Sequence, residues 1–379
     1  MGGRPDISLI VNTFRKPGHL ALVLESIARQ EGVAGRFEVV VSDDGSTDTT
    51  QDVVEAFAAR APFPVAFTTL PHDGFRLART RNQGARLAVG RALLFLDGDC
   101  VLPRDHVAAH LDRLAPGRAL LGFCARLDEA VSRSLDVADL RPGTIRRLVP
   151  RAERAALAAR HRKATWHAAF RHATKPRLAG GNFSVWREDF ARVNGCDERF
   201  VGWGQEDDDL GLRLRASGVR LESILDRTWT LHVWHPTDPS ATARWRDGTN
   251  VAYFSRHGRL TACRHGLVHR ALPDLAWRLP DDLFAGEIGR DVAAAIGATA
   301  ARERSAEGPS RPSARPEVDL VVRPGAGEFH GPAECRLLVA ATAQRGGRRP
   351  ADRAARLADV HLVAAADDRP LAERLAAAL

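Results

Sequence analysis

The chain has 379 residues, of which 44% are hydrophobic and 27% are charged, the balance of an ordinary globular protein. No apolar run approaches the roughly 20 residues that are needed to span a bilayer, and the N-terminus lacks the apolar segment and small-residue cleavage site of a secretory signal. We therefore expect a cytoplasmic protein whose contact with a membrane is at most peripheral.

Cysteines and net charge narrow the class further. The five cysteines are odd in number, widely spaced and without a CxxC pair, which argues against a disulfide framework or a cysteine zinc site. The net charge of +8 favours anionic ligands such as nucleotide phosphates, an acidic polymer or a membrane surface. Nucleic acid is not expected as a partner, because aromatic residues are only 6% of the chain and its densest motifs are acidic.

The first hundred residues alternate short apolar runs with amphipathic stretches. Apolar runs predict strands at residues 7–11, 37–46, 65–70 and 92–100, the second running into a turn and the fourth ending in acids. Helical spacing of apolar residues predicts helices at residues 17–30, 48–60 and 76–89. This alternation predicts βαβ units around a parallel sheet, and so an α/β fold.

Polar residues end three of these strands, at Asn12–Thr13, Asp43–Asp44 and Asp97–Asp99. Ligands of open parallel sheets bind beyond the carboxyl ends of the strands, so we expect these side chains to converge on one site. The patterns GxGxxG and GxxxxGK[ST] are both absent, which argues against a dinucleotide-binding fold or a P-loop.

The rest of the chain is less regular. Residues 104–175 are mixed and mostly helical in pattern, and the Pro- and Ser-rich residues 301–316 predict a linker. Beyond the linker, apolar runs predict three strands of a small α/β appendage, at residues 318–322, 336–341 and 360–365.

The triplet Asp97-Gly98-Asp99 places two carboxylates at positions i and i+2, where side chains of a strand project to the same side. Two oxygen ligands of this kind suit Mg²⁺ or Mn²⁺ carrying phosphates, and Gly98 lets a diphosphate approach closely. A carboxylate of Asp43 or Asp44 could accept from a uracil N–H or a ribose hydroxyl. For each motif alone, an ordinary aspartate turn is the alternative.

Four consecutive acids at residues 206–209 follow a Gly-Trp-Gly turn and open a helical pattern that Gly218 ends. Acids in a first helical turn meet the positive end of the helix, which is worth roughly 0.3–1 kcal/mol each, and one or two satisfy that need. Four crowd one another, which raises the pKa of some. Such crowding suits a site where one carboxylate takes a proton from an attacking hydroxyl and another holds sugar hydroxyls.

Two histidines follow the acids, at His232 and His235. A histidine near a strand end can complete the shell of a metal ion, and two neutral imidazoles could bind zinc. Their i, i+3 spacing on an extended segment predicts opposite faces, so only one of them is expected to be a ligand. A structural histidine is the alternative for each.

Four blocks together resemble the family 2 glycosyltransferases, which have the GT-A fold. ISLIVNTFRKPGHLALVLESIARQ and VVVSDDGSTDTT resemble the family's opening strand–helix–strand, and DGFRLARTRNQGARLAVGRALLFLDGDC resembles its nucleotide-sugar segment with the DxD motif. GGNFSVWREDFARVNGCDERFVGWGQEDDDLGLRLRASG resembles the acceptor segment shared with β-galactosyltransferases, polypeptide GalNAc-transferases and chondroitin-polymerase domains. The resemblance covers roughly residues 5–240.

The resemblance implies an α/β GT-A domain over residues 1–260, with a Rossmann-like, mostly parallel sheet flanked by helices. A helical extension (261–300), the linker (301–316) and the appendage (317–379) would follow. The implied activity is metal-dependent, inverting transfer of a sugar from a UDP-sugar, with Mn²⁺ or Mg²⁺ as cofactor. The acceptor would be a saccharide, a lipid-linked saccharide or another hydroxyl compound.

Residue roles follow by match to the family's motifs. Asp207 would be the general base, Glu206 would hold donor or acceptor hydroxyls, and Asp99 would bind the metal together with His232, or with His235 in reserve. The residues implied for the nucleotide sugar are Thr13, Phe14, Asp43, Asp44, Arg79, Asn82, Asp97 and Gly98, and those for the acceptor are Trp203, Gly204 and Asp208.

Some features depart from the family or leave alternatives open. Processive synthases carry QxxRW, and the nearest sequence here is Ala241–Trp245, with Ala in place of Gln, so we expect a non-processive enzyme. A sugar nucleotidyltransferase would also use DxD but would not need the WGxED block at residues 203–207. A GT-A domain that only binds a nucleotide sugar is the second alternative.

Overall fold

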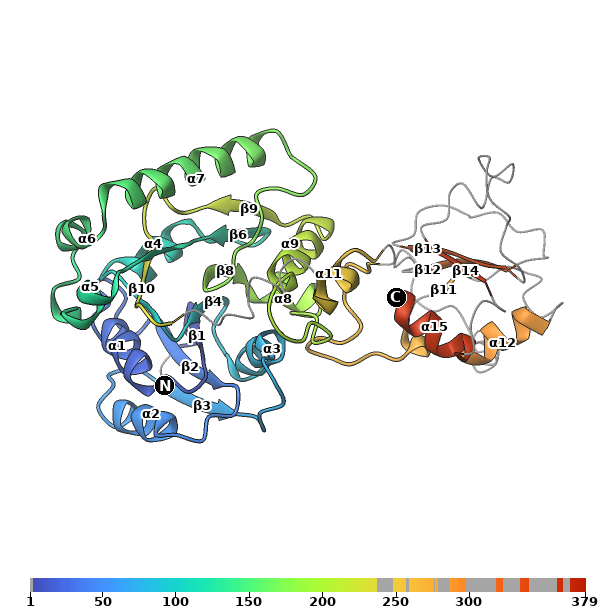
Figure 1. The fold of residues 1–379 in the computed structure, drawn as a ribbon, viewed down its shortest axis with the longest axis horizontal. Helices are drawn as coiled ribbons and strands as arrows, with labels where there is room; N and C mark the ends of the chain where they lie inside the picture. The colour runs from blue at the N-terminus through green and yellow to red at the C-terminus, as the bar shows by residue number, and fades with distance from the viewer. Residues whose placement is uncertain are drawn as a thin grey trace. The chain divides into compact units, whose positions relative to one another are not determined.

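The computed structural model describes residues 3–236, 248–256, 259–275, 277–278, 287–297, 318–322, 335–340, 360–363 and 369–379. The chain divides into two compact units, Met1–Phe254 and Ser255–Leu379 (Figure 1). The predicted linker 301–316 and the sequence Ala241–Trp245 lie outside the described residues. The predicted domain boundaries at residues 260, 300 and 316 therefore stay predictions.

A seven-stranded sheet of order β3-β2-β1-β4-β8-β6-β9 forms the centre of the N-terminal unit. Strand β8 runs antiparallel to β4 and β6, and all other neighbours are parallel. This confirms the predicted α/β fold with a mostly parallel central sheet. The strands are β1 (Ile7–Thr13), β2 (Phe37–Asp43), β3 (Val65–Thr69), β4 (Ala92–Asp97), β6 (Arg118–Leu121), β8 (Asn182–Trp186) and β9 (Arg220–Ser223).

Helices cover both faces of this sheet. On one face, α1 (Pro17–Ala28) and α2 (Thr50–Ala58) pack their apolar sides into one buried cluster with β1, β2 and β4. On the other face, α3 (Leu77–Leu87) approaches so closely that a Cβ on Gly84 would lie 2.5 Å from Cγ2 of Ile10. There Phe95 of β4 also stacks on Phe183, with ring centroids 4.7 Å apart.

A small second sheet brings distant segments to the end of β4. Its order is β5 (Cys100–Val101), β10 (Thr230–His232) and β7 (Cys124–Arg126). β10 is antiparallel to β5 and parallel to β7. The backbone N–H of Val233 donates to the carbonyl of Asp99 at 2.9 Å, so the predicted histidine segment lies directly beside the predicted metal-binding acid.

The stretch 104–175 was predicted to be mostly helical, and the structure adds strands β6 and β7 to it. These strands have four and three residues, too few for an alternating pattern to be visible.

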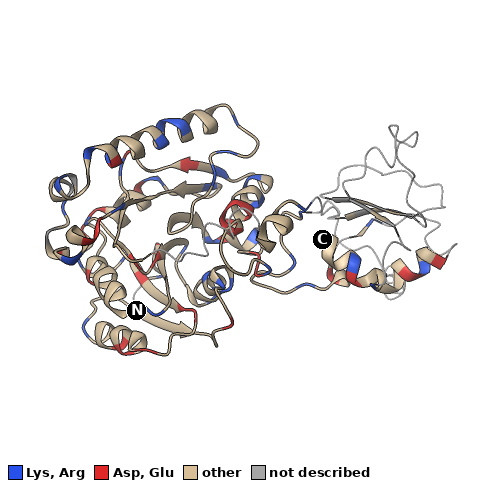
Figure 2. Ribbon diagram, in the orientation of Figure 1, with Lys and Arg blue, Asp and Glu red and all other residues tan. Residues whose placement is uncertain are grey.

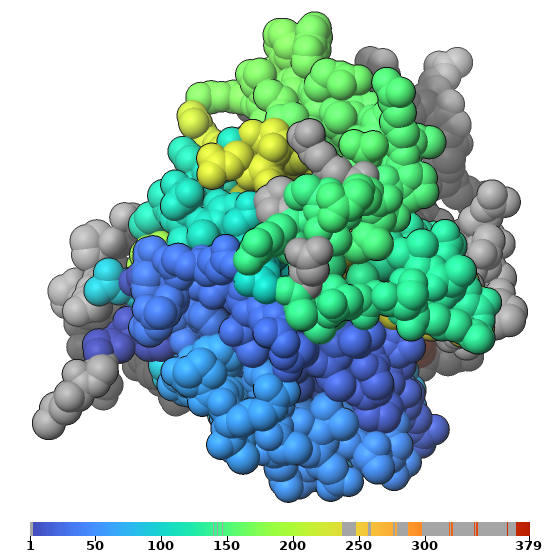
Figure 3. Space-filling view, turned by 90° about the vertical axis from the view of Figure 1, so that its left-hand side faces the viewer, coloured from blue at the N-terminus to red at the C-terminus, as the bar shows by residue number. Residues whose placement is uncertain are grey.

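The face formed by the blue N-terminal third and the green segment above it is shown in Figure 3. The helices of this stretch are α4 (His106–Arg113), α5 (Glu129–Arg133), a 3₁₀ turn (Val137–Asp139), α6 (Pro142–Leu148) and α7 (Arg151–Ala169).

The rest of the N-terminal unit carries α8 (Arg187–Arg192), α9 (Glu206–Ala216) and α11 (Thr249–Phe254). α9 begins at the first of the four acids and ends before Gly218, as predicted. No described helix combines the length and the apolar character that a bilayer span requires.

The C-terminal unit has its own parallel sheet and its own core. The sheet order is β11 (Trp277–Arg278), β12 (Val318–Val322), β13 (Cys335–Ala340) and β14 (Val360–Val363). Helices α12 (Glu287–Ala295) and α15 (Leu371–Ala378) add Val292 and Leu375 to a buried cluster with Leu320 and Leu337. This confirms the small α/β appendage, and it extends the sheet to β11, which lies in the stretch predicted to be helical.

Candidate active site

The carboxyl ends of β1, β2 and β4 bring the polar strand ends into one row. In the register of the sheet, Thr13 is opposite Asp43 and Asn12 is opposite Asp97. The N–H of Gly98 donates to the carbonyl of Asn12 at 2.7 Å, and a Cβ on Gly98 would lie 2.8 Å from that oxygen. A glycine is therefore required directly after β4, where the chain passes close to the end of β1, and this contact fixes the position of Asp97.

Asp99 and two histidines form a possible site for a cation. Nε2 of His232 lies 3.6 Å from Oδ1 of Asp99, and Nε2 of His235 lies 3.2 Å from Oδ2. The ligand atoms of the three residues all lie within 4.8 Å of one another, while an octahedral ion with bonds of about 2.1 Å spaces its ligands roughly 3–4 Å apart. The donor set therefore fits a divalent cation after a small contraction.

The expectation that the two histidines face opposite ways is wrong. β10 ends at His232, so the chain no longer alternates as a strand when it reaches His235. Both imidazoles turn toward Asp99, with their ring centroids 5.1 Å apart.

A lysine completes the surroundings of Asp99. Nζ of Lys16, the residue before α1, lies 3.0 Å from Oδ2 of Asp99. Burial alone would raise the pKa of Asp99, but the hydrogen bond from His235 and the positive charges of His232 and Lys16 lower that pKa well below its ordinary value. Asp99 is thus held as a carboxylate, which is the form that binds a metal ion.

A buried arginine joins this edge of the sheet to α9. Arg81 of α3 is fully buried, and its Nη1 donates to Oδ1 of Asp207 at 2.5 Å. Two glycines lie against both acid groups: a Cβ on Gly181 would be 2.4 Å from Oδ2 of Asp97, and a Cβ on Gly180 would be 2.3 Å from Oδ2 of Asp207. Asp97 and Asp207 therefore border the same glycine pair.

The four acids of α9 have different surroundings, because successive residues of a helix point about 100° apart. Asp207 pairs with Arg81, and Asp208 pairs with Arg177 at 3.1 Å. Asp209 is fully buried and pairs at 2.7 Å with Arg213 of the same helix. Three of the four acids thus have a cation as partner, which relieves part of the predicted crowding, and Asp209 is a structural residue.

Burial, rather than mutual repulsion, is the main reason for the raised pKa values in this cluster. Burial raises the pKa of Glu206 to about 8, with a further contribution from the charge of Asp207. It raises the pKa of Asp97 to about 7 against the opposing charge of Arg81, and that of Asp208 to about 6 against Arg177. Glu206 is thus a neutral acid at neutral pH in the ligand-free protein.

Buried polar atoms that lack a hydrogen-bond partner gather at this place. Within the described residues they include Oδ1 of Asn12, Oγ1 of Thr13, Nε and Nη2 of Arg81 and Oε2 of Glu206. Such atoms are costly in a folded protein unless something binds them. Their concentration at the carboxyl edge of the sheet marks a site for a polar ligand.

A pair of stacked aromatic rings lies beside the carboxyl end of β2. Phe14 stacks on His72, with ring centroids 4.3 Å apart, and Nδ1 of His72 lies 2.8 Å from the carbonyl of Asp44. Oδ2 of Asp44 accepts from the N–H of Arg76, and burial raises the pKa of Asp44. Flat rings next to a carboxylate suit a planar base that carries N–H groups.

The turn before α9 presents an exposed aromatic ring. Trp203 is 45% exposed and stacks on Phe75, with centroids 5.8 Å apart. Gly204 has a φ of +97°, a backbone region that favours glycine. Nδ2 of Asn250 in α11 donates to the carbonyl of Gly204 at 3.0 Å, so the turn is held from outside and offers the ring of Trp203 as a platform.

Two family models match the chain. The family described as Glycosyl transferase family 2 matches residues 8–173, and that described as N-terminal domain of galactosyltransferase matches residues 160–235. Together they cover more than half of the chain without a gap, in the order predicted from the motifs. Residues 8–173 are thus similar to glycosyl transferase family 2, and the segment that follows them is similar to the galactosyltransferase family.

The curated relatives of the chain include proteins named as sugar transferases and synthases. The chain is 32% identical over 252 residues to validoxylamine A glucosyltransferase of Streptomyces hygroscopicus subsp. jinggangensis, which covers 61% of this chain and 56% of the relative. It is 24% identical over 231 residues to chondroitin synthase of Escherichia coli, covering 58% of this chain and 33% of the relative. The chain thus spans about half the length, or less, of these curated relatives.

Among solved structures, the chain is similar to the mannosyltransferase PcManGT from Pyrobaculum calidifontis, solved with GDP-Man and Mn²⁺. The TM-score is 0.46 at 19% identity, and the match covers 81% of this chain and 77% of that chain.

Two of the residues that the family 2 motifs predicted use their polar atoms within the protein. Asn82 is fully buried, and it hydrogen-bonds the backbone N–H and carbonyl of Cys196 and the carboxylate of Glu198. It joins α3 to the loop before α9, so the expectation that it lines the nucleotide pocket is not supported. Asp43 uses its oxygens within its own turn and on Thr69.

The residue that the motif analysis missed is Arg81. The family's ARN segment directed attention to Arg79 and Asn82, but Arg79 is two positions away on α3 and so on the opposite side of the helix from Arg81. Charge balance could have indicated Arg81 from the sequence. The four acids at residues 206–209 need a cation nearby, and Arg81 lies within the segment that resembles the family's nucleotide-sugar segment.

Proposed function

We propose that the protein is a metal-dependent, inverting glycosyltransferase. It moves a sugar from a nucleotide diphosphate sugar, UDP-linked, to a hydroxyl of a saccharide or glycoconjugate acceptor. Similarity to glycosyl transferase family 2 supports sugar transfer. The observation that carries the proposal is Asp207, whose Oδ1 is fixed by Arg81 while Gly180 leaves Oδ2 without a covering side chain, beside Asp97 at the carboxyl edge of the sheet.

Asp99, His232 and His235 would hold the metal ion, with Asp97 next to it. Mg²⁺ prefers oxygen ligands in near-ideal octahedra, whereas imidazoles suit transition metals, so between Mg²⁺ and Mn²⁺ this donor set favours Mn²⁺. When bound, the ion supplies the positive charge that stabilises the leaving nucleoside diphosphate.

The chain's own residues would hold the donor at both ends. Asp44 accepts from the N–H of the base or from a ribose hydroxyl, and the ring of Phe14 stacks against the base. Oγ1 of Thr13 and the free N–H groups of Arg81 are unpartnered in the ligand-free protein. These donors suit the oxygens of the diphosphate and of the sugar.

Asp207 would act as the general base on the acceptor. Its Oδ2 accepts the proton of the attacking hydroxyl as that oxygen forms a bond to the anomeric carbon. The bond from the anomeric carbon to the diphosphate breaks at the same time, and its electron pair leaves with the diphosphate. Attack on the face opposite the leaving group inverts the anomeric configuration, through an oxocarbenium-like state. Asp207 then releases its proton to water.

Two more residues would position the acceptor. Trp203 offers an exposed ring to the apolar face of a sugar. Glu206 carries a proton at neutral pH, because burial raises its pKa to about 8. It can therefore donate a hydrogen bond to a sugar hydroxyl, while Asp207 accepts one.

The test is a donor-hydrolysis screen. The protein is incubated with UDP-, GDP- and dTDP-sugars and Mn²⁺, with and without a chelator, and release of the nucleoside diphosphate is measured. We expect hydrolysis of one UDP-sugar that stops on chelation. Pyrophosphate release from a nucleoside triphosphate and a sugar 1-phosphate would instead indicate a nucleotidyltransferase, and donor binding without turnover a binding domain.

A further inference from the structure

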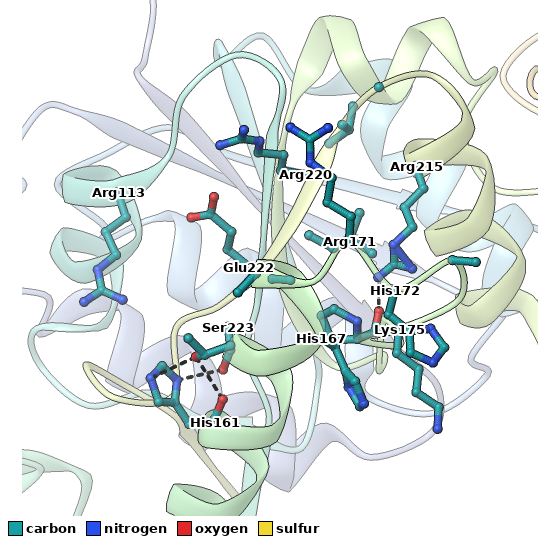
Figure 4. A pocket seen from close by; sticks show the side chains of 18 of the residues that line it. Arg113, His161, His167, Arg171, His172, Lys175, Arg215, Arg220, Glu222 and Ser223 are labelled. Carbon is teal, nitrogen blue, oxygen red and sulfur yellow. Dashed lines mark hydrogen bonds between the residues drawn. The ribbon is translucent and has the colours of Figure 1, made fainter.

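A pocket of about 960 Å³ lies at the end of α9 that is far from the four acids. The end of α7, the segment after it and strand β9 form its walls, and their labelled side chains surround it in Figure 4. Most of these side chains are basic, namely Arg171, Lys175, Arg215 and Arg220, together with His167 and His172.

The positive charge of this pocket is not neutralised by its acids. At the opposite side of the pocket, Arg113 binds Asp226 through two hydrogen bonds of 2.8 and 2.6 Å, and Arg118 lies 3.4 Å from Glu222. Within the described parts of the chain, the four cations Arg171, Lys175, Arg215 and Arg220 form no ion pair at contact distance, and only Arg215 is affected by the charge of a nearby acid, Asp208.

The charge of these residues also affects a neighbouring histidine. Besides the loss of water contact, the charges of His172 and Lys175 lower the pKa of His167. A concentration of unpaired cations around a hollow is the property of an anion-binding site.

The pocket is connected to the proposed active site by two neighbouring segments that run in opposite directions. The segment 176–181 runs beside α9: Arg215 donates to the carbonyl of Pro176, Arg177 pairs with Asp208, and Gly180 lies against Asp207. Asp207 and Arg215 are eight residues apart on one helix, which is about 12 Å at 1.5 Å per residue.

We propose that this pocket binds an anionic group of the acceptor, a phosphate or a carboxylate, about two turns of α9 away from the carboxylate that faces the hydroxyl receiving the sugar. The inference rests on the proposed function, because it takes Asp207 as the place of that hydroxyl. Arginine forks bind both anions in two-point geometry, and the volume is within the range of pockets that hold small ligands. The acceptor is therefore an acidic saccharide or a polyol phosphate, rather than a neutral one.

The test begins with binding. Isothermal titration calorimetry of the full chain with glucose 6-phosphate, glucuronate and glucose should show binding of the first two and none of the third. The pocket variant is Arg171→Glu with Arg220→Glu, both exposed and outside the proposed active site. It should bind the two anions at least tenfold more weakly than the wild type.

The matched control reverses the same charge elsewhere on α7. Arg151→Glu with Arg162→Glu changes two exposed arginines that do not line the pocket, and it should bind the anions as the wild type does. Equal weakening in both double variants would mean general electrostatic attraction and would overturn the proposal, as would a wild type that binds glucose equally well or binds neither anion.

Three further measurements distinguish this proposal from the proposed function and from lipid binding. Donor hydrolysis should be the same in the pocket variant as in the wild type. If the wild type itself did not hydrolyse a donor but still bound the anions, the proposed function would be wrong and the anion site would remain. Sedimentation with phosphatidylglycerol vesicles tests a lipid phosphate as the source. Binding of vesicles, but not of glucose 6-phosphate or glucuronate, would overturn the assignment to the acceptor. When pairs of neutral and phosphorylated oligosaccharides are offered, the charged member should show a KM at least tenfold lower, and equal use would contradict it.

Discussion

The two ends of α9 carry opposite charge. Its first turn consists of four acids, which are red in Figure 2, and its last turn carries Arg213 and Arg215. Both arrangements stabilise a helix, because its N-terminus attracts negative and its C-terminus positive charge. Only the acid end borders the carboxyl edge of the sheet, so the same helix separates a place for proton removal from a place for anion binding.

The comparison shows that charge type alone does not assign a role. Within the first turn, Asp209 is buried and paired, while Asp207 keeps one oxygen uncovered. The two acids differ in their neighbours. Asp207 lies against Gly180, which has no side chain to cover it, whereas Asp209 is covered by Arg213 of the same helix. Four experiments would break or sharpen this contrast.

The largest effect is expected from Asp207→Asn. The amide still accepts from Arg81 but cannot take a proton, so sugar transfer should fall by about 10²–10⁴-fold while donor binding is retained. The matched control is Asp52→Asn, an exposed acid in the first turn of α2, which should transfer normally. Transfer by Asp207→Asn within tenfold of the wild type would remove it from the mechanism.

Asp209→Asn should act on stability instead. It leaves Arg213 charged and fully buried without its partner carboxylate, and breaking a buried ion pair costs about 3–5 kcal/mol. Urea unfolding measures this cost. For Asp112→Asn, which breaks an exposed pair with Arg227, we expect under about 1 kcal/mol. If both variants lost the same stability, the structural assignment of Asp209 would be wrong.

The proposed metal site at the same edge of the sheet can be tested through its two histidines. His232→Ala and His235→Ala should each raise the Mn²⁺ concentration for half-maximal donor hydrolysis by about 10–100-fold, because each removes a nitrogen that faces Asp99. Excess Mn²⁺ should restore the rate, and the thermal midpoint without metal serves as the control. A variant with an unchanged Mn²⁺ requirement would show that its histidine is not a ligand.

The smallest effect concerns the pH dependence of stability. Glu206 has a pKa of about 8 in the folded protein against an ordinary value of 4.5. Between these values the folded state holds more protons than the unfolded state, so the free energy of unfolding falls as pH rises. Glu206→Gln escapes this loss, and without metal or donor it should be about 1–3 kcal/mol more stable than the wild type above pH 8. Below pH 4.5 this advantage should vanish; an equal difference at both pH values would contradict the assignment.

Long, strongly patterned elements could be predicted from sequence. β1, β2, β4 and α9 follow apolar runs that carry their own boundaries, and the strand ends located the acids correctly. The short strands β6 and β7 could not be predicted, because their pairing partners, not their own three or four residues, define them.

The site was predicted in composition more than in geometry. Motifs named Asp97, Asp99 and Asp207, and the structure brings them to one edge of the sheet. The partners of these acids were not predictable, since Lys16 reaches Asp99 only through the parallel pairing of β1 with β4, and Arg81 reaches Asp207 only through the packing of α3. The turn after β10, which brings His235 to Asp99, is likewise a tertiary feature.

The contact between Lys16 and Asp99 has a consequence for how the site is loaded. The protein supplies its own counter-charge, so its carboxylates are not left to repel one another while no ligand is present. A metal-bound nucleotide would have to displace the ammonium group from Asp99. The divalent ion would then take over the role of Lys16, so the Asp99 carboxylate would face a positive charge both before and after the donor binds.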